Sequence, residues 1–135
     1  MIFLLWEFNL LLDLLLMEIT IHEESGVIVR HFSGEVHFDD IIESWTKLLA
    51  DYPNLKAYKG ILTNYLDANV KDNERNLNVL VDFLQGNLDQ LRDLKIAVVQ
   101  DTPMITNTII LGQKVKSLQI RPFSTVDAAM RWVRL

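Results

Sequence analysis

The apolar positions of this chain change period along its length, and the changes predict alternating strands and helices. Apolar and polar residues alternate over residues 18–23, Ser25-Gly26 is a tight-turn signal, and a second strand is expected over residues 27–32. These two segments therefore predict an antiparallel hairpin. An apolar run at residues 95–99 and a further strand at residues 118–123 are each followed by helical spacing. Because buried parallel strands read as nearly continuous apolar runs, this order predicts a parallel layer of an α/β sheet.

Two amphipathic helices are expected around a third strand at residues 59–65. The first begins near Phe38 and ends before Pro53, and the second is longer and precedes the run at residues 95–99. Each carries one apolar stripe that we expect to lie on the sheet. The stripes are Ile41, Ile42, Trp45, Leu48 and Leu49 in the first helix, and Leu77, Leu80, Val81, Leu84, Leu88 and Leu91 in the second.

Length and composition predict a single α/β domain over residues 17–135, with a mixed sheet of about five strands and about four helices packed on it. The net charge of -5 disfavours a phosphate-binding surface, so we expect no nucleic-acid partner. The chain has no cysteine, which excludes disulfides, thiolate nucleophiles and zinc–thiolate sites. We expect a cytoplasmic protein without a cofactor.

Residues 1–16 form an apolar leader interrupted only by Glu7, Asn9 and Asp13. No basic residue precedes Arg30, so the leader does not have the charged beginning of an export signal. It is also short for a membrane span and would carry two carboxylates, so membrane association is disfavoured. Three hypotheses stay open, in order of preference: residues added by an upstream start before Met17, a packing or dimerising helix, and membrane association.

Candidate chemical groups are sparse. His31, His37, Asp39 and Asp40 offer nitrogen and oxygen ligands within a short window and raise the question of a metal site. Their spacing matches no known metal motif, and the two aspartates are explained more simply as first-turn carboxylates of the following helix. The chain contains no glycine-rich phosphate loop, Gly-x-Ser-x-Gly elbow or His-Glu-x-x-His pair. An enzyme is therefore the function class with the least support.

The hairpin through Gly26, the strands at residues 60–62 and 95–99, and the closing segment at residues 122–133 together resemble the SpoIIAA-like family. This family groups STAS anti-sigma-antagonist domains with SEC14-type lipid-binding domains. The closing segment, in which a strand ends in Phe123 and a capped helix with Ala128-Ala129 carries an alanine and Trp132 onto the sheet, is the most specific part. The resemblance covers the chain from about Met17 onward and implies the fold more strongly than the function.

Departures from the family pattern restrict what the resemblance implies. STAS antagonists carry a phosphorylatable Ser or Thr where the helix after the third strand begins, but residues 64–101 contain neither residue type. Many small SpoIIAA-like proteins end the third strand with an aspartate, whereas this chain has Asn64. An amide cannot serve as a carboxylate base, so an acid/base site at that strand tip is disfavoured.

These observations predict a non-catalytic interaction or regulatory module that binds a protein partner or a second copy of itself. The alternative is a carrier of a small apolar or lipid ligand, with a pocket lined by Met104, Ile105, Ile109, Ile110 and Leu111. Ligands gather at the carboxyl ends of parallel strands, so the contact surface is expected in the loop at residues 66–73 and the turn at residues 101–103. Its candidate residues are Asn64, Asp67, Asn69, Asp72, Asn73, Asp101, Thr102 and Pro103.

Overall fold

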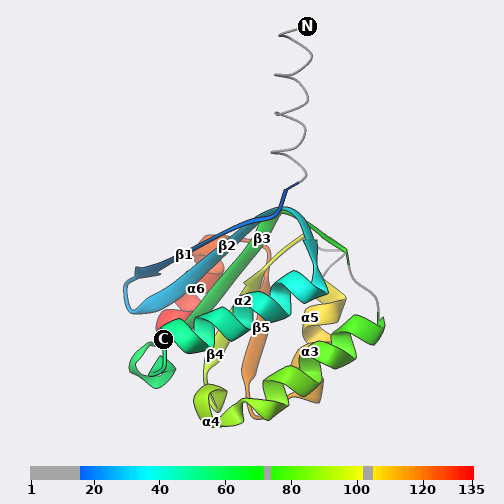
Figure 1. Cartoon of the computed structure of the whole chain (residues 1–135). Helices are drawn as coiled ribbons and strands as arrows, with labels where there is room; N and C mark the ends of the chain where they lie inside the picture. The colour runs from blue at the N-terminus through cyan, green and yellow to red at the C-terminus, as the bar shows by residue number, and fades with distance from the viewer. Residues whose placement is uncertain (1–15, 72–73, 102–104) are drawn as a thin grey trace, which may run out of the picture.

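A five-stranded mixed sheet forms the centre of the molecule (Figure 1). The computed structural model describes residues 16–71, 74–101 and 105–135. The strands lie in sequence order, β1 pairs with β2 antiparallel, and all other neighbours are parallel. The predicted mixed sheet is therefore confirmed. The strands are β1 (Glu18–Glu24), β2 (Val27–His37), β3 (Gly60–Lys71), β4 (Lys95–Val99) and β5 (Gln119–Phe123).

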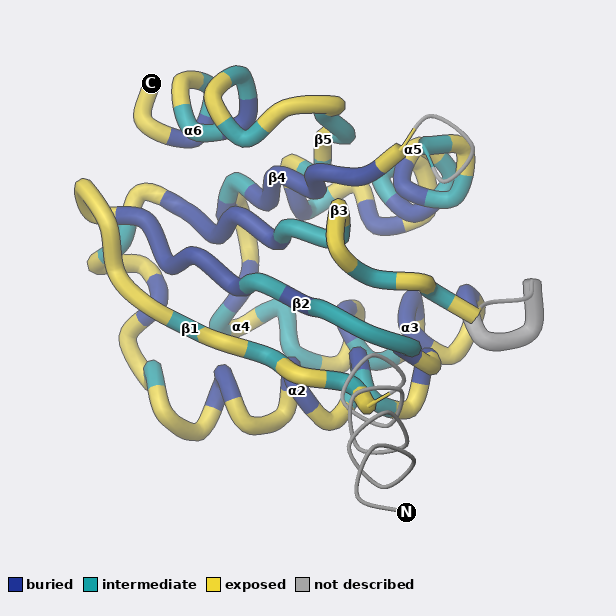
Figure 2. Tube along the Cα trace, turned by 90° about the horizontal axis from the view of Figure 1, so that it is seen from above, coloured by how far each residue is buried: buried dark blue, intermediate teal, exposed yellow. Residues whose placement is uncertain are grey.

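Helices cover both faces of this sheet (Figure 2). In the described part of the chain there are five α-helices, one more than about four expected, and a short 3-10 turn at Leu55–Ala57. Buried residues of the first four helices join one core cluster, and α6 contributes to a second cluster on the opposite face. The helices are α2 (Phe38–Asp51), α3 (Glu74–Gly86), α4 (Leu88–Leu91), α5 (Ile105–Lys114) and α6 (Val126–Arg134).

The predicted hairpin between β1 and β2 is confirmed. Ser25 and Gly26 have φ angles of 53° and 78°, and Glu24 pairs with Val27 across the turn. Two consecutive positive φ angles match a type I′ turn, whose twist suits an antiparallel hairpin. Both strands extend beyond their predicted limits, and β2 continues to His37.

The predicted loop at residues 66–73 was wrong for its first part, because β3 extends through Lys71. Residues 33–37 of β2 pair in parallel with residues 67–71 of β3, and we call this pairing the β2–β3 ribbon. Apolar and polar residues alternate over residues 66–71, as in a strand, but Asp67 and Asn69 are turn-favouring types that obscured the pattern. A register shift separates the ribbon from the rest of the sheet, since His31 pairs with Asn64 and Ser33 with Asp67.

The second predicted helix is divided into two. α3 ends at Gly86, and α4 carries Leu88 and Leu91 of the predicted stripe. The break occurs at Asn87, whose side-chain amide donates to the Phe83 carbonyl over 2.8 Å. Glycine followed by asparagine is a weak helix-forming pair, and an asparagine side chain readily bonds to the preceding turn. The period of the leucines alone could not reveal this local competition.

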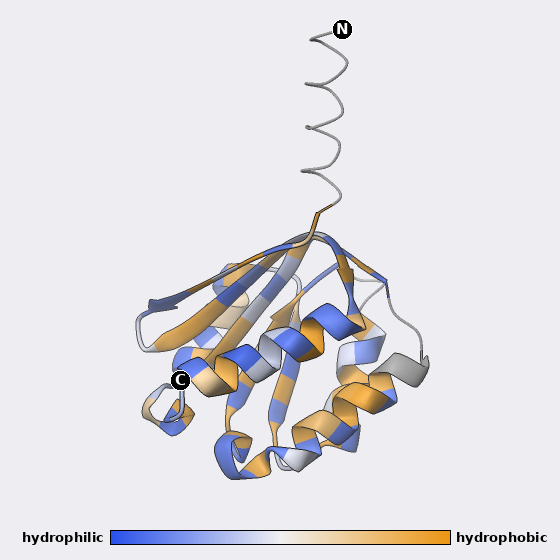
Figure 3. Ribbon diagram, in the orientation of Figure 1, coloured by the Kyte–Doolittle hydropathy of each residue, from blue (hydrophilic) through white to orange (hydrophobic). Residues whose placement is uncertain are grey.

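Two apolar cores hold the layers together, and their residues appear as the apolar positions of strands and helices in Figure 3. The larger core includes Phe32, Leu48 and Leu84, all essentially inaccessible to solvent. Burying a side chain of this size stabilises the fold by about 1.5–3 kcal/mol. The smaller core joins Ala129 and Val133 of α6 to β2, β3 and β4. The larger core also contains a cavity whose lining includes a buried arginine, Arg30.

Candidate functional site

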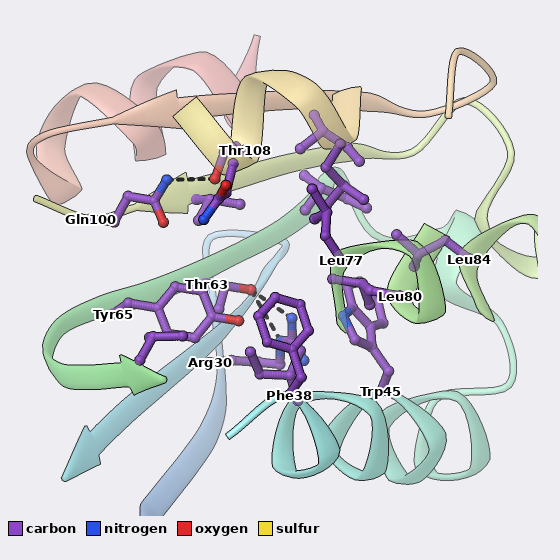
Figure 4. Close-up of a pocket in the computed structure, with 17 residues that line it drawn as sticks. Arg30, Phe38, Trp45, Thr63, Tyr65, Leu77, Leu80, Leu84, Gln100 and Thr108 are labelled. Atoms are coloured by element: carbon purple, nitrogen blue, oxygen red, sulfur yellow. Dashed lines mark hydrogen bonds between the residues drawn. The ribbon is translucent and has the colours of Figure 1, made fainter. Parts of the chain in front are cut away.

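A cavity of about 70 Å³ lies within the larger core, between the sheet and helices α2, α3 and α5 (Figure 4). Its wall is mainly apolar, with polar side chains contributed by the strands and by α5. The cavity therefore combines an apolar lining with a few convergent polar groups, as small-molecule sites do. The lining residues are Arg30, Phe38, Ile41, Trp45, Thr63, Tyr65, Val70, Leu77, Leu80, Leu84, Ile96, Val98, Gln100, Asn107, Thr108, Leu111 and Ile120.

Arg30 is the charged residue among the described residues that line the cavity, and it is only 1% exposed. It lies in β2 between Ile28 and Phe32, which both belong to the larger core. Side chains two residues apart share a face of a strand, so Arg30 is directed into that core. The alternation was visible in the sequence, and sequence reasoning nevertheless missed this residue.

Two hydroxyl groups and one indole ring hold the Arg30 guanidinium. Nε and Nη2 donate to Thr63 Oγ1 over 3.1 and 2.8 Å, and Nη1 donates to Ser44 Oγ over 3.1 Å. The guanidinium carbon lies 4.2 Å from the centroid of the Trp45 ring. Trp45 was expected to be a core residue; it is buried, and it also forms a cation–π contact with Arg30.

No carboxylate neutralises Arg30 among the described residues. The ion pairs of that part of the chain join His31 to Asp67 and His37 to Glu35. Burial lowers the pKa of Arg30 to about 10, an effect that Tyr65 partly opposes. The side chain therefore remains a cation at neutral pH. Burial also raises the pKa of Tyr65, so its phenol is neutral under the same conditions.

Polar groups from β4 and α5 line another part of the cavity. Gln100, which follows β4, donates through Nε2 to Thr108 Oγ1 on α5 over 2.5 Å. Of the α5 residues expected to line a pocket, Leu111 does so. Ile109 is 45% exposed, and neither Ile105 nor Ile110 belongs to the lining. Met104 lies outside the described residues.

The structure places the predicted contact residues in three different settings. Asn64, Asp67 and Asn69 lie along β3, and Asp101 follows β4 at the same end of the sheet, because Asn64 pairs with Val99. Asp67, Asn69 and Asp101 are exposed. Asp72, Asn73, Thr102 and Pro103 lie outside the described residues.

Asn64 and Asp67 also stabilise the register shift where the ribbon begins. The Asn64 side-chain oxygen accepts a hydrogen bond from the Leu66 backbone N–H over 2.9 Å. The Asp67 carboxylate lies 2.6 Å from Nε2 of His31, on the neighbouring strand. The amide at position 64 therefore supports the bulge, a role that its residue type alone does not reveal.

The residues of the metal hypothesis have other contacts. His31 pairs with Asp67, and Asp40 accepts a hydrogen bond from the His37 backbone N–H over 2.9 Å at the start of α2. Asp39 and Asp40 are the first-turn carboxylates of that helix, as expected. Across residues 16–71, 74–101 and 105–135, no three histidine or acidic side chains converge in a way that could hold a metal ion.

Among the described helices, none is both long enough and apolar enough to cross a membrane.

Known proteins match this chain in structure and not in sequence. No family model matches the sequence, and no curated protein matches it. An anti-sigma factor antagonist from Mycobacterium paratuberculosis is similar with a TM-score of 0.60 and 17% identity, over 89% of this chain and 96% of that one. An uncharacterised protein with a SpoIIAA-like fold from Shewanella loihica has a TM-score of 0.59 and 10% identity, over 87% and 93%.

These similarities define the class of structure: the chain has a SpoIIAA-like α/β fold. The resemblance deduced from the sequence is thus confirmed at the level of the fold. Identities of 17% and 10% carry no function from one protein to the other, so function must be argued from the sites of this chain.

Proposed function

We propose that this chain is a non-catalytic regulatory module that docks a protein partner at the end of its sheet where the β2–β3 ribbon projects. The observation that carries the proposal is the ribbon itself. β4 pairs with β3 only from Gly60 to Asn64, so in the described part of the molecule no strand covers the β4-side edge of residues 65–71. Such an edge can pair with an extended segment of another chain.

The side chains of the ribbon suit a specific contact. Asp67, Asn69 and Lys71 are exposed, while Ala68 and Val70 pack against the larger core and keep the ribbon in place. Asp101 lies at the same end of the sheet, so the surface carries acidic and amide groups. Backbone pairing would supply affinity, and these side chains would supply specificity.

The proposed function class agrees with the name of one fold neighbour, the anti-sigma factor antagonist from Mycobacterium paratuberculosis, although the ribbon of this chain carries the proposal. In this chain, regulation would not depend on phosphorylation at the helix after β3, because residues 64–101 contain no serine or threonine. The switch would instead be the availability of the partner or of a ligand.

Affinity capture with matched charge variants tests the docking surface. Asp67→Arg and Glu24→Arg each change an exposed carboxylate to a cation, and Glu24 lies at the opposite end of the sheet, beside the hairpin turn. We expect to capture a partner that the unaltered chain and Glu24→Arg both retain and that Asp67→Arg loses. Once purified, this partner should bind the first two chains with a lower Kd than it binds Asp67→Arg. Equal retention by all three chains, with circular dichroism confirming their folding, would contradict the proposal.

The cavity favours a second candidate function, which is carriage of a small, mainly apolar molecule. Its lining is chiefly apolar and its volume of about 70 Å³ exceeds that of an ordinary packing defect. Native mass spectrometry after purification without detergent tests this function directly. A reproducible added mass supports carriage, whereas an empty chain that also binds no small probe excludes it.

A further inference from the structure

The cavity presents a cation whose cost to the fold is not offset by any described carboxylate. Buried charges are normally paired, because removing an ion from water costs several kcal/mol even after relaxation. Arg30 is 1% exposed, and its hydrogen-bond partners are the neutral hydroxyls of Thr63 and Ser44. Two hydroxyl dipoles do not neutralise a full positive charge. Among the described residues, the charge of Arg30 therefore has no counter-ion.

The Arg30 side chain is also held ready to receive such a group. A guanidinium has five N–H donors, and Arg30 uses three of them in its bonds to Thr63 and Ser44. The Trp45 ring packs against the guanidinium, 4.2 Å from its carbon to the ring centroid. An aromatic ring on the face leaves the donors in the guanidinium plane able to bond. Preorganised donors lose little entropy when a ligand binds.

We propose that the cavity binds a small monocarboxylate with a short apolar chain, whose carboxylate bonds to Arg30. This proposal rests on the second candidate function, carriage of a small molecule, and specifies its ligand. The apolar chain would lie among Leu77, Leu80 and Leu84 of α3, which line the same cavity. Arginine and carboxylate match in geometry as well as in charge, and their charge-assisted hydrogen bonds are stronger than neutral ones.

Charge and volume both favour a monocarboxylate over a phosphate or a long lipid. Arg30 is the one cationic side chain among the described residues of the lining, so a phosphate dianion would remain half neutralised among apolar residues. The cavity volume of about 70 Å³ is several times the roughly 10–15 Å³ of cavity that one water needs. The site therefore suits a carboxylate with a short apolar chain, and an acyl chain of lipid length would require α3 or α5 to move.

Binding of an isosteric pair of probes to the full chain tests the charge. Hexanoate and hexanamide have nearly the same shape and differ by one charge, and calorimetry with tryptophan fluorescence reports both. We expect hexanoate to bind at least about tenfold more tightly than hexanamide, as a charge-assisted bond to a buried partner implies. Equal binding of both probes would overturn the assignment of the anion and leave carriage intact. Failure of both probes to bind would overturn carriage and the anion together.

Variants of two arginines test whether Arg30 causes the preference for hexanoate over hexanamide. Arg30→Gln keeps hydrogen-bonding capacity without charge and should reduce hexanoate affinity to the level of hexanamide. Arg121→Gln is the control, because Arg121 is exposed, contacts Trp132 and does not line the cavity. Retained discrimination in a folded Arg30→Gln chain would overturn the proposal. If that variant does not fold, the comparison of hexanoate with hexanamide in the unaltered chain still tests whether the cavity prefers an anion.

Competition and chain length test the remaining claims. Inorganic phosphate should not displace hexanoate at equal concentration, and displacement would assign the site to phosphate instead. Affinity should rise from butyrate to hexanoate and then level off or fall by decanoate, as a small cavity requires. A continued rise through decanoate would overturn the size limit and indicate that the helices open for a long acyl chain.

Discussion

The buried Arg30 cation lowers the stability of the fold, although it is the residue that we propose binds the ligand. Its burial lowers its pKa to about 10, which measures how strongly the fold disfavours the cation. The contacts with Thr63, Ser44 and Trp45 offset part of this cost. Proteins retain such local conflicts chiefly at functional sites, where stability and activity have different requirements.

Replacing Arg30 with an apolar residue of similar length should therefore not weaken the fold. For Arg30→Met we expect the free energy of unfolding to stay the same or to rise by about 1–3 kcal/mol, because buried charges replaced by packed apolar groups often behave so. Urea denaturation measures this change. Leu48→Ala, at a buried apolar position in the same core, is the control and should lose about 2–5 kcal/mol. A loss for Arg30→Met comparable to that control would make Arg30 a purely structural residue.

The same pair of chains should differ in pH dependence. The pKa of Arg30 is about 10 in the folded state and higher in the unfolded chain, so below pH 10 both states hold the proton and the full burial cost opposes folding. Above about pH 10 the folded state releases its proton first. The unfolded state then binds more protons, and stability rises with pH relative to Arg30→Met.

Urea denaturation from pH 7 to 11.5 checks this expectation. Any advantage of Arg30→Met should be constant up to about pH 9 and should shrink above pH 10. Tyr65 couples to Arg30 and its own pKa is raised by burial, so both chains are best compared with Tyr65→Phe in the background. A difference that stays constant through pH 11.5 would mean that the buried cation does not govern stability.

At the scale of elements, the β2–β3 ribbon depends on a glycine that the sequence did not single out. Gly34 has a φ of 81°, and a Cβ at this position would lie 2.1 Å from the Leu16 carbonyl oxygen. A side chain there would meet both an unfavourable backbone angle and a collision with backbone atoms. The ribbon and the segment before β1 therefore require glycine at this position.

Gly34→Ala should destabilise the protein by about 2 kcal/mol or more, since backbone strain and the collision with Leu16 add. Gly86→Ala is the matched control: it ends α3, and a Cβ there would meet no atom within 4 Å. It should stabilise the helix by up to about 1 kcal/mol. Thermal unfolding of the two variants measures the contrast. Equal effects would show that the ribbon tolerates a different backbone at position 34.

The elements that local sequence patterns specify were predicted well. The limits of elements where local residue preference competes with tertiary contacts were not. Ser25-Gly26 forms the expected turn, and α6 begins with Thr125 accepting from the Ala128 N–H over 3.2 Å. The end of β3 and the break after Gly86 were wrong, because turn-favouring residues in a strand and a side-chain bond at a helix end are settled by tertiary neighbours.

At the scale of the molecule, the cavity could not have been predicted because no single segment forms it. Its lining comes from four strands or their ends and from three helices, and the residues span positions 30–120. Arg30 and Thr63 meet only because β2 and β3 lie side by side. Alternation in β2 places Arg30 on the core face, but the absence of a nearby acid among the described residues emerges only in three dimensions.

The span of the cavity leads to a prediction about the whole chain. The described residues that line the cavity all lie between Arg30 and Ile120, and the sheet begins at Glu18, so we expect a version beginning at Met17 to fold and to keep the site. Native mass spectrometry and hexanoate calorimetry, applied to this version and to the full chain, should give the same bound mass and a Kd within about twofold, a difference below RT in free energy. A dimer seen only with residues 1–16 present would make that segment an interface without affecting the site. Loss of folding or of binding in the shorter version would instead make residues 1–16 part of the domain, and the domain boundary at Met17 would be wrong.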